Sequence, residues 1–124
     1  MKKVFISYTR EDWQTAEKIK SNLTAMGHMV WRDRDEITGG ELWRAEIVEA
    51  IENCDTFILV ISSRSIKSKY VLQELNIADS EGKRILPARI EPVEIPKEMK
   101  LQLSGLQMID LSQEEGWNTL WKSI

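Results

Sequence analysis

The sequence is poor in the two residues on which disulfide frameworks and many metal sites depend. Cys54 is its single cysteine and His28 its single histidine. One cysteine forms no intrachain disulfide and no cysteine metal cluster, and one histidine excludes most zinc sites and any catalysis by two histidines. A single unpaired cysteine is typical of a reducing compartment, so we expect the protein in the cytoplasm.

Long apolar runs and an excess of basic residues are also missing. The longest apolar run is Phe57 to Ile61, whereas a membrane-spanning helix needs about 20 residues. The stretch Val4 to Ile6 is too short for the core of a signal peptide. The chain has 17 Lys and Arg against 20 Asp and Glu, a net charge of −3. We therefore expect neither membrane insertion nor direct binding of nucleic acid.

Length and composition fit one globular domain. The 124 residues are 42% hydrophobic and 30% charged, enough for one core and too few for two. The helix predicted from the last periodic apolar residues reaches Ile124, with no glycine to end it. The chain is therefore either cut from a longer protein or ends barely folded. We favour the first reading, in which residues 1–124 are the N-terminal domain of a longer protein.

Strand-like and helix-like segments alternate along the chain. Short β-rich stretches are predicted at residues 3–7, 28–32, 56–61, 84–90 and 107–111. Apolar residues between them recur at spacings of three and four, which predicts amphipathic helices at 11–26, after Gly40, near 65–80 and from 117 onward. Trp13 and Met26 are assigned to the apolar face of the first helix, and Thr9 with Asp12 is expected to form its capping box.

This alternation predicts an α/β fold with a parallel sheet and helices on both faces. Residues 56–61 (TFILVI) are apolar on both faces, which places this strand at the centre. Five strands in this length fit the flavodoxin-like order 2-1-3-4-5. Pro87 in the fourth strand predicts a bulge or a position near an edge. Ligands of such sheets bind beyond the carboxyl ends of the strands, here where loops 8–10, 33–40 and 62–69 converge.

Common phosphate-binding and hydrolase motifs are absent. The chain has no GxGxxG after its first strand, no GxxxxGK[ST] and no GxSxG. An acidic cluster at Asp33, Asp35 and Glu36 suggests a phosphoacceptor site with magnesium. The third strand, however, ends in Ile61-Ser62-Ser63 and lacks the aspartate that receiver domains of this fold need there. A receiver domain is therefore disfavoured.

The segments at these loops resemble the Toll/interleukin-1 receptor (TIR) domain family. Phe5-Ile6-Ser7-Tyr8 is similar to its box one, and GHMVWRDRDEITGGELW (27–43) to its second strand and BB loop. Residues 47–62 fit the next helix and strand, and SIKSKYVLQEL (65–75) resembles the block that carries the catalytic glutamate of enzymatic members. The ordered set spans nearly the whole chain, and its motifs are closer to bacterial and plant members than to animal receptors.

For a bacterial-type enzymatic member, the resemblance implies cleavage of NAD+ at the nicotinamide–ribose bond. The products are nicotinamide and either ADP-ribose or a cyclic isomer; NAD+ is the substrate, and no separate cofactor or metal is implied. Glu74 matches the catalytic glutamate. Tyr70, one helical turn earlier, matches an aromatic residue that is usually tryptophan. The other positions that match the family's nucleotide cleft are Tyr8, Thr9, Arg10, Asp33 and Trp43.

The resemblance also implies self-association through the BB loop, which contains Asp35, Glu36 and Ile37. An apolar Ile37 in a charged, protruding loop indicates a contact surface. Other TIR domains are then expected as partners, in a homo-oligomer or filament. A C-terminal sensor or effector domain would supply the trigger, and the family suggests a role in anti-phage immune signalling.

Two other functions stay open from the sequence: a non-enzymatic module that recruits other TIR domains, and a nucleoside-processing transferase of similar fold. Without the resemblance, Glu74 is an ordinary solvated carboxylate, and Tyr70 and Trp43 are packing residues. Release of nicotinamide separates the enzyme from the module, and release of a free base from deoxynucleosides identifies the transferase. We expect Glu74 to face the crevice unpaired, so that its loss hardly changes stability.

Overall fold

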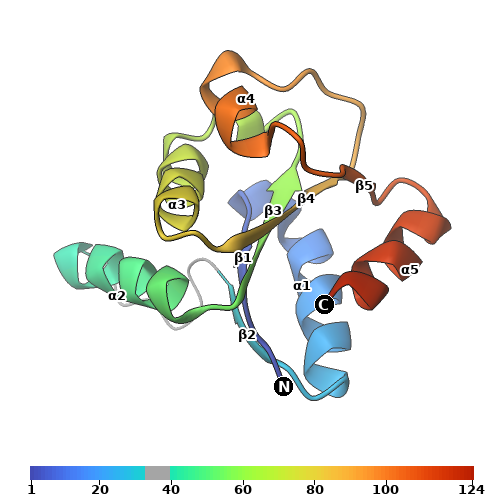
Figure 1. The fold of residues 1–124 in the computed structure, drawn as a ribbon, viewed down its shortest axis with the longest axis horizontal. Coiled ribbons are helices and arrows are strands. Elements are labelled where there is room, and N and C mark those ends of the chain that lie inside the picture. The colour runs from blue at the N-terminus through green and yellow to red at the C-terminus, as the bar shows by residue number, and fades with distance from the viewer. Residues whose placement is uncertain (33–39) are drawn as a thin grey trace.

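The computed structural model describes residues 1–32 and 40–124, with only the backbone of 40–43. In this part of the chain, five strands form one parallel sheet in the order β2-β1-β3-β4-β5 (Figure 1). This is the predicted flavodoxin-like order. The strands are β1 (Lys3–Ser7), β2 (Met29–Arg32), β3 (Thr56–Ile61), β4 (Arg84–Arg89) and β5 (Ile109–Asp110).

Helices cover both faces of this sheet (Figure 1). One face carries α2 (Gly40–Asn53), α3 (Lys69–Ser80) and α4 (Lys97–Leu103), and the other carries α1 (Trp13–Ala25) and α5 (Glu114–Ser123). Two short 3-10 turns, η1 (Arg10–Asp12) and η2 (Ser65–Lys67), precede α1 and α3. The sequence analysis missed α4, because a helix of seven residues contributes only Met99 and Leu103 to the core.

The central strand is β3, as its two apolar faces predict. All six of its residues are buried. Phe57 pairs in register with Phe5 of β1, and the two rings stack with centroids 5.6 Å apart and planes 7° from parallel. β1 and β3 are therefore the two paired strands at the middle of the sheet. Because they run parallel, their carboxyl ends lie side by side at the same edge of the sheet.

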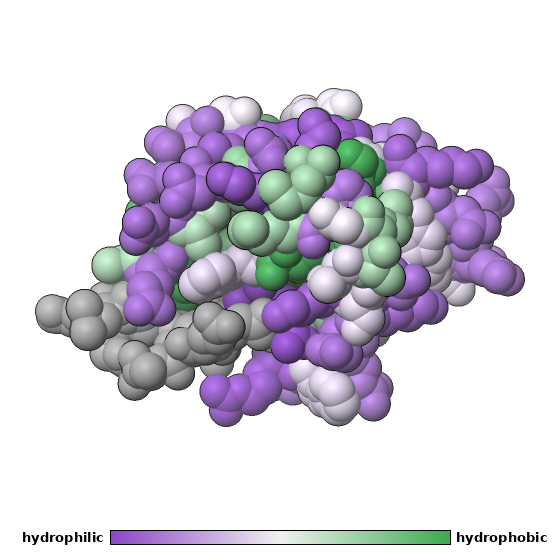
Figure 2. All heavy atoms as spheres, turned by 90° about the horizontal axis from the view of Figure 1, so that it is seen from below, coloured by the Kyte–Doolittle hydropathy of each residue, from purple (hydrophilic) through white to green (hydrophobic). Residues whose placement is uncertain are grey.

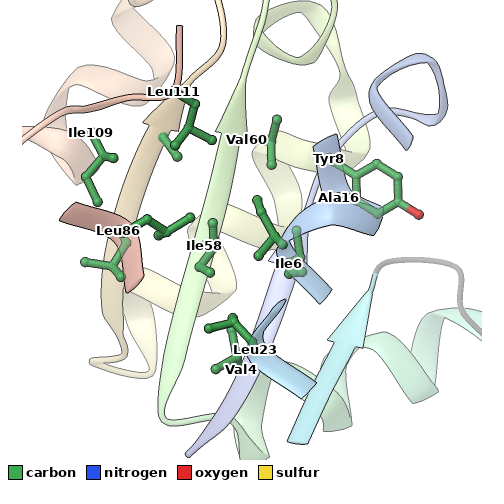
Figure 3. Close-up of a cluster of buried hydrophobic side chains, with 13 residues drawn as sticks. Val4, Ile6, Tyr8, Ala16, Leu23, Ile58, Val60, Leu86, Ile109 and Leu111 are labelled. Carbon is green, nitrogen blue, oxygen red and sulfur yellow. The ribbon is translucent and has the colours of Figure 1, made fainter. Parts of the chain in front are cut away.

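Each face of the sheet has its own apolar core. Val4, Ile6, Ile58 and Val60 lie together on one face of the sheet (Figure 3). They share a core with Ala16, Ile19 and Leu23 of α1 and Leu120 of α5. On the other face, the core against α2, α3 and α4 includes Phe5, Phe57, Leu59, Ile51 and Leu75. Neighbouring residues of a strand point to opposite faces, which assigns them alternately to the two cores.

Two expectations for the first helix are wrong. Trp13 is 54% exposed and Met26 50% exposed. Trp13 begins α1 and Met26 follows its last residue, so both lie outside the stretch in which Ala16, Ile19 and Leu23 are buried. Thr9 makes no capping bond to the backbone; its hydroxyl donates to Asp12 Oδ2 over 2.8 Å. The Asp12 carboxylate is held by groups from another loop, which removes it from the predicted capping box.

Pro87 lies in a regular part of β4, in register with Leu59 of β3, so the predicted bulge is absent. The alternative, a position near an edge, is correct. β5 pairs with β4 only at Ala88 and Arg89. At Pro87 the outer side of β4 therefore has no partner strand among the described residues, and the missing N–H of proline disrupts no ladder.

The surface seen from below is mainly hydrophilic, with a smaller hydrophobic area near its middle (Figure 2). In the part of the chain that the structure describes, no helix combines the length and apolar character that crossing a bilayer requires.

Candidate active site

Glu74 is a buried carboxylate at the carboxyl end of the sheet. Its residue is 4% exposed, on the stripe of α3 that also buries Val71, Leu75 and Ala78. The helix is started by Ser68, whose Oγ accepts a hydrogen bond from the Val71 backbone N–H at 3.2 Å. Glu74 thus occupies a core position of the helix, and the expectation of an unpaired, outward-facing acid is wrong.

One hydrogen-bond partner of this carboxylate comes from a distant part of the chain. The hydroxyl of Ser7 donates to Glu74 Oε1 over 2.6 Å, and the contact is buried. Ser7 is the last residue of β1 and is fully buried. A buried carboxylate needs hydrogen-bond donors to offset its lost hydration, and a hydroxyl donating to a charged oxygen is a strong one.

Glu74 lines a pocket between α2 and α3 with a volume of about 370 Å³. This lies in the range of about 300–1,000 Å³ that is usual for small-molecule sites. Tyr70, one turn before Glu74 on α3, is 38% exposed and lines the same pocket. Arg44 of α2 supplies a positive charge, and the remaining lining residues are Ile47, Val48, Gln73, Asn76 and Ile77.

Size alone does not single out this pocket. A hollow of about 500 Å³ lies beside β2 and α2, and another of about 390 Å³ lies near β4, α4 and α5. Neither is lined by a buried carboxylate, whereas the α2–α3 pocket is. A buried ionisable group in a cleft marks a candidate for chemistry, so the site is assigned to the pocket that contains Glu74.

A second polar cluster confirms that the loops after β1 and β3 converge. Asp12 is 4% exposed, and its Oδ2 accepts from Thr9 Oγ1 at 2.8 Å and from Ser62 Oγ at 2.6 Å. Arg64 donates to Oδ1 from Nε at 3.0 Å and from Nη2 at 2.6 Å. With both oxygens bonded to the protein, this carboxylate joins the two loops.

The same cluster extends to the loop after β4 through Glu91. Glu91 Oε1 accepts from the Ser63 backbone N–H at 2.7 Å and lies 3.4 Å from Arg64 Nη2. The hydrogen bond from Ser63 lowers the pKa of Glu91, and the hydrogen bond to Asp12 raises the pKa of Arg64. The three loops are thereby held together beside the start of α3.

The structure does not bring all the sequence-predicted residues to one place. Tyr8 is buried on the α1 side of the sheet, opposite to Glu74; Figure 3 shows its ring beside Ala16. Thr9 is bonded to Asp12, and Arg10 is exposed in η1. Four predicted residues lie outside the described part of the chain: Asp33, Asp35, Glu36 and Ile37.

Trp43 lies in α2, where the structure describes its backbone only.

Ser7 and Arg44 were not predicted as site residues from the sequence. A signal for Ser7 existed, because a serine in an otherwise apolar strand needs a buried partner. No sequence signal pointed to Arg44, since an arginine at an exposed helix position is common.

The chain is similar to proteins of one family over almost its full length. A model of the TIR domain family matches residues 4–122. No curated protein sequence matches the chain.

Similar solved structures share the fold. The TIR domain of the Toll-related receptor TRR-2 from Hydra magnipapillata is 24% identical, with a TM-score of 0.80 over 99% of this chain and 98% of that one. The CMP N-glycosidase BcmB from Clostridium botulinum is 19% identical, with a TM-score of 0.77 over 98% of both chains. The TIR domains of the activated Roq1 resistosome are 15% identical, with a TM-score of 0.76 over 99% of both chains.

Proposed function

Because the chain belongs to the TIR domain family, we propose that it is a bacterial-type member that cleaves NAD+ at the nicotinamide–ribose bond. The observation that carries this proposal is the buried Glu74 carboxylate, which lines the α2–α3 pocket beside Tyr70. Glu74 also lies in the segment that resembles the catalytic block of the enzymatic members.

The chemistry suits a site with one carboxylate. Nicotinamide is a pyridinium in NAD+ and becomes neutral as it leaves, so its departure needs no proton donor. Ordinary glycosidases need a second carboxyl group for that step. The remaining task is to stabilise positive charge that develops on the ribose. A fixed anion that is itself buried does this well, because water screens it little.

Each residue of the pocket receives a role in this proposal. Glu74 binds the ribose hydroxyls and faces the developing oxocarbenium charge. Tyr70 provides an aromatic face against which the nicotinamide ring stacks. The likeness to a protein named as a CMP N-glycosidase supports the choice of bond, because nicotinamide is also joined to ribose by an N-glycosidic bond. The other predicted contacts, Asp33 and Trp43, belong to the proposal on the family resemblance alone.

The products and the setting complete the proposal. Attack by water gives ADP-ribose, and attack by an atom of the substrate itself gives a cyclic isomer. Chromatography of the products with both standards distinguishes the two. We place the activity in the cytoplasm, in anti-phage immune signalling, with a C-terminal sensor domain as the trigger. Assembly of the TIR domains in the Roq1 resistosome supports activation by self-association.

The test of the proposed activity is nicotinamide release from NAD+ by the wild type and by Glu74→Gln. The variant keeps the size of the side chain and deletes the charge, so the rate falls by about 10²-fold or more. Glu49→Gln, an exposed glutamate of α2, is the matched control and keeps the wild-type rate. Full cleavage by a folded Glu74→Gln protein contradicts the mechanism. No cleavage by the wild type, even when artificially clustered, favours the non-enzymatic module.

Self-association has its own test. Specific activity is expected to rise with protein concentration, and Ile37→Asp is expected to abolish the rise, because it places an unpaired charge in the contact. Specific activity that stays flat from dilute to concentrated protein contradicts self-activation.

A further inference from the structure

We propose that Ser7 is a positioning residue for the Glu74 carboxylate. Its hydroxyl holds Oε1 in the orientation that the reaction needs. The inference rests on the proposed function, since it gives Ser7 a task in NAD+ cleavage.

The geometry gives Ser7 an unusually fixed place. It ends β1, where its Cα pairs in register with that of Leu59 in the central strand. Its side chain is fully buried, so water does not compete for the hydroxyl. The 2.6 Å distance from Oγ to Glu74 Oε1 is typical of a hydroxyl donating to an ionised carboxylate. Two rigid elements, β1 and α3, are thus joined at the candidate catalytic group.

Positioning matters for this carboxylate because of how it acts. A glutamate side chain has three rotatable bonds, and an anion that moves among orientations stabilises a developing charge less than a fixed one. A hydrogen bond from the sheet removes this freedom before the substrate arrives. Ser7 therefore acts through Glu74 and needs no contact with the substrate itself.

The chain contains a matched control for this role. Ser62, directly after β3, is also fully buried and also donates to a buried carboxylate over 2.6 Å, but its acceptor is Asp12 Oδ2. Removal of either hydroxyl deletes one short, buried serine–carboxylate hydrogen bond at the same end of the sheet. The Ser62 Oγ also accepts from the backbone N–H groups of Ser65 at 3.0 Å and Arg64 at 3.3 Å, so Ser62→Ala loses more contacts than Ser7→Ala. Only the Ser7 bond involves Glu74. A purely structural role therefore predicts that Ser62→Ala lowers kcat at least as much as Ser7→Ala does.

The experiment measures kcat, KM for NAD+ and the urea midpoint of unfolding for Ser7→Ala, Ser62→Ala and Ser7→Thr. For Ser7→Ala, kcat is expected to fall by about 10- to 100-fold, the scale of a misplaced catalytic group, with KM within about twofold of the wild type. Ser62→Ala is expected to unfold at lower urea with kcat unchanged. Ser7→Thr restores the hydroxyl and is expected to recover most of kcat.

The outcomes separate this role from the proposed function. A wild-type kcat in Ser7→Ala overturns the role of Ser7 alone, as does an equal fall of kcat in Ser62→Ala. A natively folded Ser7→Thr protein that is as slow as Ser7→Ala also overturns it. A wild type that releases no nicotinamide at any concentration overturns the proposed function, and the role of Ser7 with it.

Discussion

Arg64 donates two hydrogen bonds to the same oxygen of Asp12, from Nε at 3.0 Å and from Nη2 at 2.6 Å. The Asp12 carboxylate is buried, whereas the Arg64 side chain is 41% exposed. The pair joins the turn before α1 to the loop after β3, which leads into α3. The contact thus links two loops at the carboxyl end of the sheet.

Replacement of Asp12 should therefore be costly. Asp12→Ala removes the acceptor shared by Thr9, Ser62 and Arg64 and is expected to lower the free energy of unfolding by about 2–4 kcal/mol. Glu11→Ala, at the exposed neighbouring position, should change it by less than about 0.5 kcal/mol. Urea unfolding of both variants checks this. Equal midpoints for the two would show that the Asp12 contacts contribute little to stability.

The buried Cys54 should make stability fall at alkaline pH. Burial raises the pKa of its thiol from 9.0 to about 11. Between these values the unfolded chain loses the thiol proton and the folded chain keeps it, so stability is complete below pH 9 and declines as pH rises to 11. The expected loss is about 2–3 kcal/mol.

The matched variant for this prediction is Cys54→Ala, which has no thiol to titrate. Urea midpoints at pH 8 and pH 11 are compared for both proteins. The wild type should lose more stability over this interval than the variant does. An identical pH dependence of the two would mean that the thiol ionises alike in the folded and unfolded chains.

Arg44 should make the pocket prefer phosphorylated over unphosphorylated substrates. It lines the pocket with Glu74 and carries a positive charge there. We expect Arg44→Gln to raise KM for NAD+ about tenfold, the value of one charge-assisted hydrogen bond, and to leave KM for nicotinamide riboside unchanged. Lys100→Gln, an exposed residue of α4, gives the same change in net charge and serves as control. An equal change in KM for both substrates would show that Arg44 does not recognise phosphate.

Gly116 should resist replacement even though it lies in a helix. Alanine normally stabilises a helix interior by about 1 kcal/mol relative to glycine. A Cβ at Gly116, however, would collide with the backbone carbonyl of Asp110 in β5. The collision outweighs the gain in helix propensity, so Gly116→Ala is expected to lower the melting temperature. Asn118→Ala, on the same helix, should raise it or leave it unchanged. A melting temperature raised by Gly116→Ala would contradict the close approach of α5 to β5.

The order of the strands was predictable because alternating strands and helices favour a parallel sheet, for which few topologies are common. The central strand has its predicted bounds, 56–61, because the apolar run 57–61 and the β-branched Thr56 before it form one β-rich segment. Ala16, Ile19 and Leu23 fill the predicted face of α1. The predicted strand at 107–111 is shorter in the structure, Ile109–Asp110, because β4 offers it only two paired residues. A limit set by a neighbouring strand leaves no trace in the segment's own sequence.

The site was predictable only where its residues are close in sequence. Tyr70 and Glu74 line one pocket because they lie one turn apart on α3. The contact between Ser7 and Glu74 joins residues 67 positions apart, and it depends on strand register and helix rotation together. The burial of Glu74 was not predicted, because most glutamates are exposed to solvent. Its neighbours at 71, 75 and 78 nevertheless define a buried stripe on α3.

The alternation of β1 has a consequence for genetics. Val4, Ile6 and Tyr8 belong to the core under α1, whereas Phe5 packs, and Ser7 bonds, toward the helices on the other side. A mutational scan along residues 4–8 should therefore single out position 7. Substitutions at the four core positions 4, 5, 6 and 8 should lower the amount of folded protein, whereas Ser7→Ala should yield folded protein with a reduced rate. Within this short segment, one position that affects activity thus stands among four positions that affect stability.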